Sequence, residues 1–283
     1  FSVIDRDTYL SQYSHVSVLP SMCVQTVKTD EHGKPVRAKS RIVALGNHEE
    51  KIWSKSDRYA PVLQKESSRL LTSMAVELGV VEKQGDCKNA FCHPTLPKDE
   101  KIIVRPPPGR PLSKPGKLWL LNKTLYGLRR SPYHWYQTLR KVLEGIGLTA
   151  CPHDPCVFTG TLIEGEPPLF FGTYVDDFKY FSASPAVEKA FEQAIGSKLT
   201  IDFMGPVSWY LGCHYVWEHT PDGRLSVSIT QTAKIDQLVE DFGMEDANSV
   251  TSPYRSGFVI DRIPHDGINP DSKQKKVKQY QSL

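Results

Sequence analysis

Two adjacent carboxylates interrupt an apolar segment, and this feature constrains the fold more than any other. The segment LFFGTYVDDFKYFSA, residues 169–183, reads as a β-hairpin with aromatic and branched residues on both sides of Asp176 and Asp177. Burying one unpaired carboxylate is costly, and two like charges side by side repel each other. We therefore expect positive charge to meet them at the hairpin tip. The alternative is a solvent-exposed turn, where aspartates are common.

A third carboxylate follows a separate predicted strand. The segment VVEKQGDCKNAF, residues 80–91, reads as a strand running into Asp86, and an antiparallel sheet could bring Asp86 beside the hairpin tip. Hard divalent cations suit converging carboxylates, because Mg²⁺ prefers carboxylate and phosphate oxygens. Two such ions about 3.5–4 Å apart activate an attacking hydroxyl and stabilise a leaving pyrophosphate. Asp86, Asp176 and Asp177 are thus candidate catalytic and metal-binding residues.

The order of predicted elements around these carboxylates indicates the fold class. A strand ending at Asp86, a helix, the hairpin, a second helix and a strand follow one another, which predicts an α+β fold with an antiparallel sheet backed by helices. No Gly-rich phosphate loop indicates a doubly wound sheet. Ser67 or Ser68 and Ser131 are the expected helix caps, and Leu70, Leu71, Met74, Ala75 and Leu78 the expected buried stripe of the first helix. The predicted helices cover residues 67–78, 131–146, 184–195 and 232–243, and further strands cover 208–217 and 224–229.

Basic residues gather on a second predicted hairpin. Residues 23–46 contain two strand-like runs around turn residues 30–34, and Arg37, Lys39 and Arg41 alternate on the second run, so they share one face. On the residues alone a solvated face is the simpler interpretation, and a cationic wall for phosphates is the functional one. The net charge of +3 permits a nucleic-acid partner without requiring one.

Composition excludes several other classes of protein. Hydrophobic residues make up 39% of the 283 residues, an ordinary globular content, and no apolar run approaches the ~20 residues of a membrane span. The six cysteines lack the spacing of a zinc site, so we expect free, mostly buried intracellular thiols. Because the chain begins with Phe1 rather than Met, we expect a piece of a longer polypeptide.

Eight recognisable sequence blocks follow one another along the chain: RAKSRIVALG, YAPV, QGDCKNAF, NKTLYGLRRSPYHWY, HDPCVF, YVDD, WYLGCHY and SITQTAKI. Together they resemble the reverse transcriptases of copia-type retrotransposons (Pseudoviridae). LYGLRRSPYHWY is far more specific than YVDD alone, and the blocks occur in order over roughly residues 20–255. The resemblance implies an RNA-directed DNA polymerase with a right-hand fold of fingers, palm and thumb.

The resemblance also implies a domain layout and partners. It places the fingers in 1–80 with 93–125, the palm in 81–92 and 126–215, and a partial thumb with the start of a connection in 216–283, without a ribonuclease H domain. The implied partners are an RNA template, a DNA primer or product, deoxynucleoside triphosphates, and the rest of the Pol polyprotein with its integrase and ribonuclease H. No membrane is involved. Family habit implies two Mg²⁺ ions, with Mn²⁺ as an alternative, and cytoplasmic virus-like particles with later nuclear import of the product.

Individual roles follow from the matching motifs. Asp86 and Asp176 would carry the two-metal chemistry with Asp177 in support. Phe91 would clash with a 2′-hydroxyl and so select deoxynucleotides, although the local run alone favours a core phenylalanine.

Lys39 and Arg41 match a triphosphate-holding strand, which replaces the interpretation of a solvated face. The other implied nucleotide-binding residues are Tyr126, Gly127, Arg129 and Tyr174. The implied primer–template residues are Trp209, Tyr210, Leu211 and Gly212, with core packing the alternative for the two aromatics.

One departure from the family keeps another function open. The segment IDFMG, residues 201–205, has Asp202 where relatives often carry a lysine. If that lysine protonates the leaving pyrophosphate, its role is vacant here or filled by another residue, for which Lys198 is a nearby candidate. The alternative function is therefore a decayed or repurposed copy that binds nucleic acid without polymerising. An RNA-synthesising viral polymerase is disfavoured by Phe91.

Overall fold

The computed structural model describes residues 1–29, 35–109, 116–248, 250, 251 and 257. The chain divides into two compact units, residues 1–231 and a second unit from Thr232 onward, and each is taken by itself. In the second unit α6 (Thr232–Asp241) confirms the helix predicted over 232–243. The predicted turn at 30–34 and the predicted connection after residue 257 lie outside the described residues. Within the described ranges, no helix has both the length and the apolar character to cross a bilayer.

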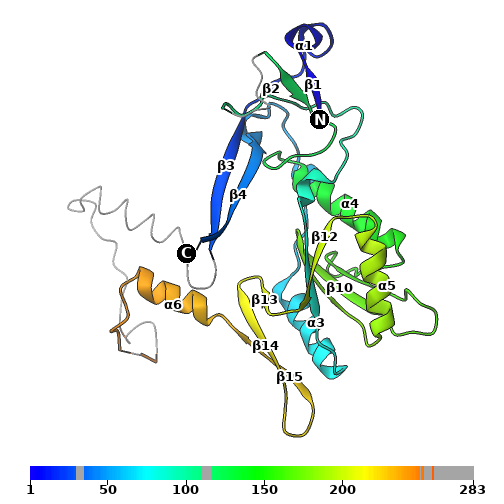
Figure 1. Cartoon of the computed structure of the whole chain (residues 1–283), viewed down its shortest axis with the longest axis vertical. Helices are drawn as coiled ribbons and strands as arrows, with labels where there is room; N and C mark the ends of the chain where they lie inside the picture. Colours follow the sequence, from blue (N-terminus) through cyan, green and yellow to red (C-terminus); the bar gives the residue numbers. More distant parts are fainter. Residues whose placement is uncertain (30–34, 110–115, 249, 252–256, 258–283) are drawn as a thin grey trace. The chain divides into compact units, whose positions relative to one another are not determined.

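A six-stranded antiparallel sheet forms the centre of the first unit (Figure 1). Helices α4 (Ser131–Gly145) and α5 (Pro185–Gly196) cover one face, where Trp135, Phe171 and Phe191 belong to one buried cluster. The predicted antiparallel sheet backed by helices is therefore confirmed. In spatial order the strands are β12 (Ile201–Pro206), β5 (Lys83–Cys87), β11 (Asp177–Phe181), β10 (Leu169–Tyr174), β9 (Val157–Gly160) and β8 (Thr149–Ala150).

Helix α4 begins at the residue predicted to be its cap, so its N-cap lies one residue earlier. Its N-cap is Arg130, and Ser131 is the first helical residue, whose hydroxyl donates instead to the Leu125 carbonyl oxygen at 2.6 Å. The cap expected at Ser131 is therefore wrong. Pro132 in the first turn fits the helix because proline lacks the N–H group that has no helical acceptor there.

Helix α3 (Lys65–Glu77) packs against the opposite face of the sheet, with Leu71 and Ala75 against Phe181. The caps expected at Ser67 and Ser68 are wrong, because the N-cap is Gln64, whose N–H donates to Asp154 Oδ2 at 3.0 Å. The expected stripe is also wrong in part, since Leu70 and Leu78 are 62% and 50% exposed. The buried residues Ser68, Leu71, Thr72 and Ala75 show that the inward face is partly polar.

Two smaller sheets are built mainly from the N-terminal half of the chain. β3 (Ser21–Thr29) and β4 (Pro35–Ala44) pair as the long two-stranded ribbon in Figure 1, which confirms the hairpin predicted over 23–46. A four-stranded sheet encloses a separate core around Trp119. Its strands are β1 (Ser2–Ile4), β7 (Leu118–Leu120), β6 (Ile103–Val104) and β2 (Val18–Leu19) in spatial order, and the short helices nearby are α1 (Arg6–Gln12), α2 (Lys55–Arg58) and the 3₁₀ turns Gly46–His48 and Ala90–Cys92.

The segment predicted as one strand over 208–217 is instead a hairpin. β13 (Trp209–Tyr210) and β14 (Cys213–His219) pair around Leu211 and Gly212, whose φ angles are +50° and +77°. A positive φ is uncommon for leucine, so composition did not reveal the turn. β15 (Leu225–Thr230) completes this three-stranded sheet and confirms the strand predicted over 224–229.

None of the six cysteines forms a disulfide bond, as expected. Cys87 and Cys156 are buried, but the other four are half-buried, so the prediction of mostly buried thiols is wrong. Burial raises the pKa of both buried thiols to about 12.

Candidate active site

Three carboxylates converge at one edge of the central sheet. Asp177, the first residue of β11, is the cross-strand partner of Asp86 in β5, and the Cys87 N–H donates to the Asp176 carbonyl oxygen at 2.9 Å. Directly opposed residues of an antiparallel pair project their side chains to the same face. The prediction that Asp86 lies beside the hairpin tip is confirmed.

A strained two-residue turn presents Asp176 and Asp177. Val175 has φ +62°, an uncommon conformation for a β-branched residue that costs on the order of 1–3 kcal/mol. The indole N–H of Trp135, which is 2% exposed in α4, donates to the Val175 carbonyl oxygen at 2.7 Å. Helix α4 therefore holds the turn from the face opposite the carboxylates.

The carboxylates line a pocket of about 790 Å³. Arg37 and Lys39 of β4 line the same pocket, as do all four residues Trp209, Tyr210, Leu211 and Gly212 of the β13–β14 hairpin. Acidic, basic and aromatic groups therefore share one concave surface, as is usual for a small-molecule or substrate site.

The negative charge of the cluster affects neighbouring groups. Burial is the main cause of the raised pKa of Cys87, and the charges of Asp86 and Asp176 raise it further. The pKa of Tyr126 is raised chiefly by burial and also by Asp176, while Arg41 opposes the shift. The carboxylates thus add to the effect of burial on both groups, and Arg41 opposes it at Tyr126.

The donor set fits hard divalent cations without forming a complete metal cage. Asp86, Asp176 and Asp177 offer carboxylate oxygens to one pocket, yet no group of at least three His, Cys, Asp or Glu side chains in the described ranges is gathered closely enough to hold an ion by itself. Mg²⁺ is usually bound through one or two carboxylates, with water and substrate phosphate completing the shell. The arrangement therefore fits ions that bind together with a phosphate-bearing substrate.

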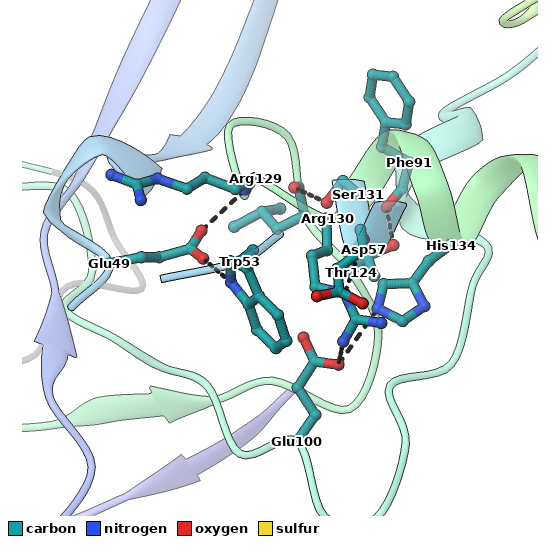
Figure 2. Close-up of polar contacts among 11 residues, drawn as sticks. Glu49, Trp53, Asp57, Phe91, Glu100, Thr124, Arg129, Arg130, Ser131 and His134 are labelled. Atoms are coloured by element: carbon teal, nitrogen blue, oxygen red, sulfur yellow. Dashed lines mark hydrogen bonds and ion pairs between the residues drawn. The ribbon is translucent and has the colours of Figure 1, made fainter. Parts of the chain in front are cut away.

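A tight backbone junction connects β4 to the loop before α4. A Cβ on Gly127, which has φ +88°, would lie 2.0 Å from the Ala44 carbonyl oxygen, and a Cβ on Gly46 would lie 2.2 Å from the Gly127 oxygen. Glu49 reinforces the junction by accepting from the Arg129 N–H at 2.8 Å and from the Trp53 indole at 3.0 Å (Figure 2). Gly127 therefore serves a close approach of two backbones.

Arg130 extends this junction toward α2 and α4. Its guanidinium lies 4.3 Å from the Trp53 ring centroid and donates to Glu100 Oε2 at 2.5 Å (Figure 2). His134 Nε2 lies 3.3 Å from the same oxygen. These contacts fix the start of α4, the helix that holds the turn before Asp177.

The other predicted nucleotide-binding residues lie at different distances from this pocket. Lys39 and Tyr126 line it, and Arg41 stacks over Tyr126 with 5.6 Å to the ring centroid. Phe91 packs partly buried against the core and edge-on to Tyr126 at 5.3 Å, so it lies behind the pocket wall.

Five of the seven predicted nucleotide-binding residues do not line the pocket: Arg41, Phe91, Gly127, Arg129 and Tyr174. Arg129 is outside the lining, and its guanidinium donates to the Asn47 carbonyl oxygen at 3.1 Å. Tyr174, opposite Asp177 and 37% exposed, is also outside it.

Comparison with known families identifies this arrangement. A family model described as reverse transcriptase (RNA-dependent DNA polymerase) matches residues 8–256. The chain belongs to this reverse transcriptase family. Its central sheet and covering helices are accordingly those of the α+β right-hand polymerase fold.

The relatives of this reverse transcriptase confirm the resemblance to copia-type elements. The Retrovirus-related Pol polyprotein from transposon TNT 1-94 of Nicotiana tabacum is 28% identical over 228 residues, which are 80% of this chain and 17% of that polyprotein. The Pol polyprotein from transposon RE1 of Arabidopsis thaliana is 27% identical over 240 residues, or 85% of this chain and 16% of the relative. A foamy viral protease-reverse transcriptase solved in complex with ds DNA has 18% identity and a TM-score of 0.36, covering 86% of this chain and 36% of that one.

Several residues of the reverse transcriptase pocket were not selected from the sequence. Lys88 lines it and pairs with Asp202 at 2.5 Å, whereas Lys198, the residue suggested earlier, is not part of the lining. Asp202 itself is the β12 partner of Asp86, so it shares the carboxylate face. Arg37 also lines the pocket. Its alternation with Lys39 along the strand could have predicted that both side chains share the face that lines the pocket.

Proposed function

We propose that this chain is the polymerase part of a retrotransposon reverse transcriptase, transferring deoxynucleotides to a primer 3′-hydroxyl on an RNA or DNA template. The observation that carries this proposal is the pairing of Asp86 with Asp177 beside a tip that carries Asp176, all lining one pocket with Arg37 and Lys39. The chain spans about a sixth of the curated polyproteins it matches, so activity and partners are proposed for this segment alone.

Each part of the pocket has a role in the proposed reaction. Asp86, Asp176 and Asp177 would hold two Mg²⁺ ions, for which Mn²⁺ is an alternative. The bound ions would activate the primer hydroxyl and neutralise charge on the leaving pyrophosphate. Arg37, Lys39 and neighbouring cations of β4 attract the triphosphate, and Trp209 to Gly212 support the primer end.

Most of the catalytic effect in such a site comes from positioning and charge stabilisation. The rigid supports are the Trp135 bond to the turn and the backbone junction at Gly127. Contacts to the nucleic acid would run mainly through phosphates, so binding should be independent of sequence and weaken as salt rises.

Phe91 is proposed to select the sugar. Its edge-on contact with Tyr126, a residue that lines the pocket, supports a role near the nucleotide. Phe91→Ala should raise incorporation of ribonucleotides relative to deoxynucleotides, because the 2′-hydroxyl distinguishes the two substrates. Equal discrimination by the parent and the variant would show that Phe91 is a core residue only.

Primer extension tests the proposal. The parent should extend oligo(dT) on poly(rA) with dTTP and Mg²⁺, and Asp176→Asn should lower the rate by about 100-fold or more. Asp222→Asn, in the exposed turn before β15, is the matched carboxylate control and should extend like the parent. Equal extension by the parent and Asp176→Asn would mean that the signal comes from a contaminant. Tight template–primer binding without extension in the parent would instead identify a nucleic-acid-binding copy.

A further inference from the structure

A buried ion pair lies beneath the candidate active site. Lys179 Nζ is 2.9 Å from Glu82 Oε1 and 3.0 Å from Glu82 Oε2, and neither side chain is accessible to solvent. The same ammonium donates to the Ser68 carbonyl oxygen at 2.8 Å and to Thr72 Oγ1 at 2.6 Å. All three of its N–H groups therefore have acceptors.

Stability alone does not explain this pair. Burial lowers the pKa of Lys179 and raises that of Glu82, and in each case the partner opposes the shift. Apolar residues of similar volume are often as stabilising as a buried ion pair, or more so. An ion pair differs from an apolar contact in that its hydrogen bonds are directional.

The first connection is between α3 and the strand that carries Asp177. Lys179 is two residues after Asp177 in β11, so both side chains project to the same face of the sheet. Its cross-strand partner is Gly172, where a Cβ would lie 2.7 Å from Leu71 of α3. The missing side chain lets α3 approach until Ser68 and Thr72 reach the ammonium.

The second connection is to the β13–β14 hairpin, which forms one wall of the pocket. The Lys179 ammonium lies 5.8 Å from the Tyr210 ring centroid and 5.9 Å from that of Tyr215, within cation–π range. The carbonyl oxygen of Glu82 accepts from the Val207 N–H at 2.8 Å, just before β13. Both members of the pair thus contact the hairpin or its lead-in.

We propose that Lys179 and Glu82 are positioning residues that hold the β13–β14 hairpin at a fixed place relative to Asp177 and Asp86. The consequence for catalysis rests on the proposed polymerase function. The structural part of the proposal, that the ion pair fixes the hairpin to β11, does not depend on the polymerase function. A loosened hairpin would let Trp209 and Leu211 move away from the carboxylates, and a shift of about 1 Å in a reacting group can cost about 100-fold in rate.

The test replaces both charges together. The double variant Lys179→Met with Glu82→Leu leaves no lone buried charge and roughly keeps the side-chain volume. The matched control is Lys83→Met, because Lys83, the residue after Glu82, pairs with Glu188 at 2.9 Å and Glu192 at 3.1 Å in α5, which covers the other face of the sheet. Amide hydrogen exchange over residues 209–215 and single-nucleotide kcat and KM are measured for the three proteins.

The double variant should melt at the parental temperature or above, yet exchange residues 209–215 about tenfold faster or more. Its kcat should fall about 10- to 100-fold with little change in the KM for dTTP, because the hairpin positions the primer end rather than the nucleotide. Lys83→Met should match the parent in both measurements. Parental exchange at residues 209–215 in the double variant overturns the proposal.

Further outcomes separate this inference from the proposed function. If the double variant does not fold, Glu82→Gln removes one charge and keeps the shape, and unchanged exchange over residues 209–215 would then overturn the proposal. A parent that cannot extend primers, together with faster exchange in the variant, would refute the polymerase function and retain the positioning pair. Faster exchange with parental kcat would refute the catalytic consequence of the pair.

Discussion

Trp135→Phe tests how the hairpin tip is held. The substitution removes the indole N–H that donates at 2.7 Å to the carbonyl oxygen of Val175, the residue with φ +62° just before Asp176. Trp119→Phe is the matched control, because Trp119 is also 2% exposed but its indole N–H has no hydrogen-bond partner among the described residues. The two variants lose the same ring atoms and differ in the hydrogen bond.

The expected magnitudes follow from these contacts. Losing the buried ring atoms costs roughly 2 kcal/mol of unfolding free energy in each variant. At Trp135 the Val175 carbonyl keeps only a long 3.4 Å contact from Thr173 Oγ1, which adds about 1–2 kcal/mol. At Trp119 the removal of an unpaired buried N–H returns about 1–2 kcal/mol. Trp135→Phe should therefore cost about 2–4 kcal/mol more than Trp119→Phe.

Urea unfolding at 25 °C measures both free energies, and single-nucleotide incorporation measures the effect on the site. Trp135→Phe should be the less stable protein and should also have the lower kcat, because the turn carries Asp176 and leads directly into Asp177. Losses that agree within about 0.5 kcal/mol would refute the claim that this bond holds the turn.

Three more predictions concern stability. Tyr210→Phe removes a buried hydroxyl that has no hydrogen-bond partner in the described part of the chain, so thermal melting should show a gain of about 1 kcal/mol, and a loss would indicate a hidden partner. Gly127 has φ +88°, and a Cβ there would lie 2.0 Å from the Ala44 oxygen, so Gly127→Ala should lower the free energy of unfolding in urea by more than about 2 kcal/mol. The control Gly79→Ala, at φ +68° in open space, should lower it by about 1 kcal/mol. Equal losses would contradict the close approach. The pKa of Cys87 is raised from 9.0 to about 12, so folding favours its protonated form, and stability is full below pH 9 and falls as pH approaches 12. Cys87→Ala should show a shallower fall over that window in chemical denaturation, and an identical fall would refute the shift.

The sequence predicted the parts of the site that depend on residues close together in the chain. The β10–β11 hairpin was predictable because apolar runs flank the two aspartates, and Asp86 followed because it ends a short strand. In an antiparallel sheet that strand has few positions in which it can pair with the hairpin. In the structure it pairs with β11, which sets Asp86 opposite Asp177.

The parts that were missed depend on contacts distant in sequence. Leu211 has φ +50°, an uncommon leucine conformation, so its turn read as the middle of a strand. Ser68 read as a cap but is buried, because its carbonyl oxygen accepts from Lys179, 111 residues away. The junction contacts of Arg129, whose backbone N–H donates to Glu49 and whose guanidinium donates to the Asn47 carbonyl oxygen, were likewise not predicted. The spacing of apolar residues along the sequence does not predict an ion pair between distant residues or a residue with a positive φ angle.

Single-turnover incorporation of one dTTP on a defined RNA template with a DNA primer tests the central claim most directly. The rate is compared for the parent, Asp86→Asn, Asp177→Asn and the surface control Asp222→Asn at saturating template–primer. The account predicts a loss of about 100-fold or more for the two pocket variants, with unchanged template–primer binding, and the parental rate for the control. A parental rate in Asp86→Asn would contradict the assignment of these facing carboxylates as the catalytic centre.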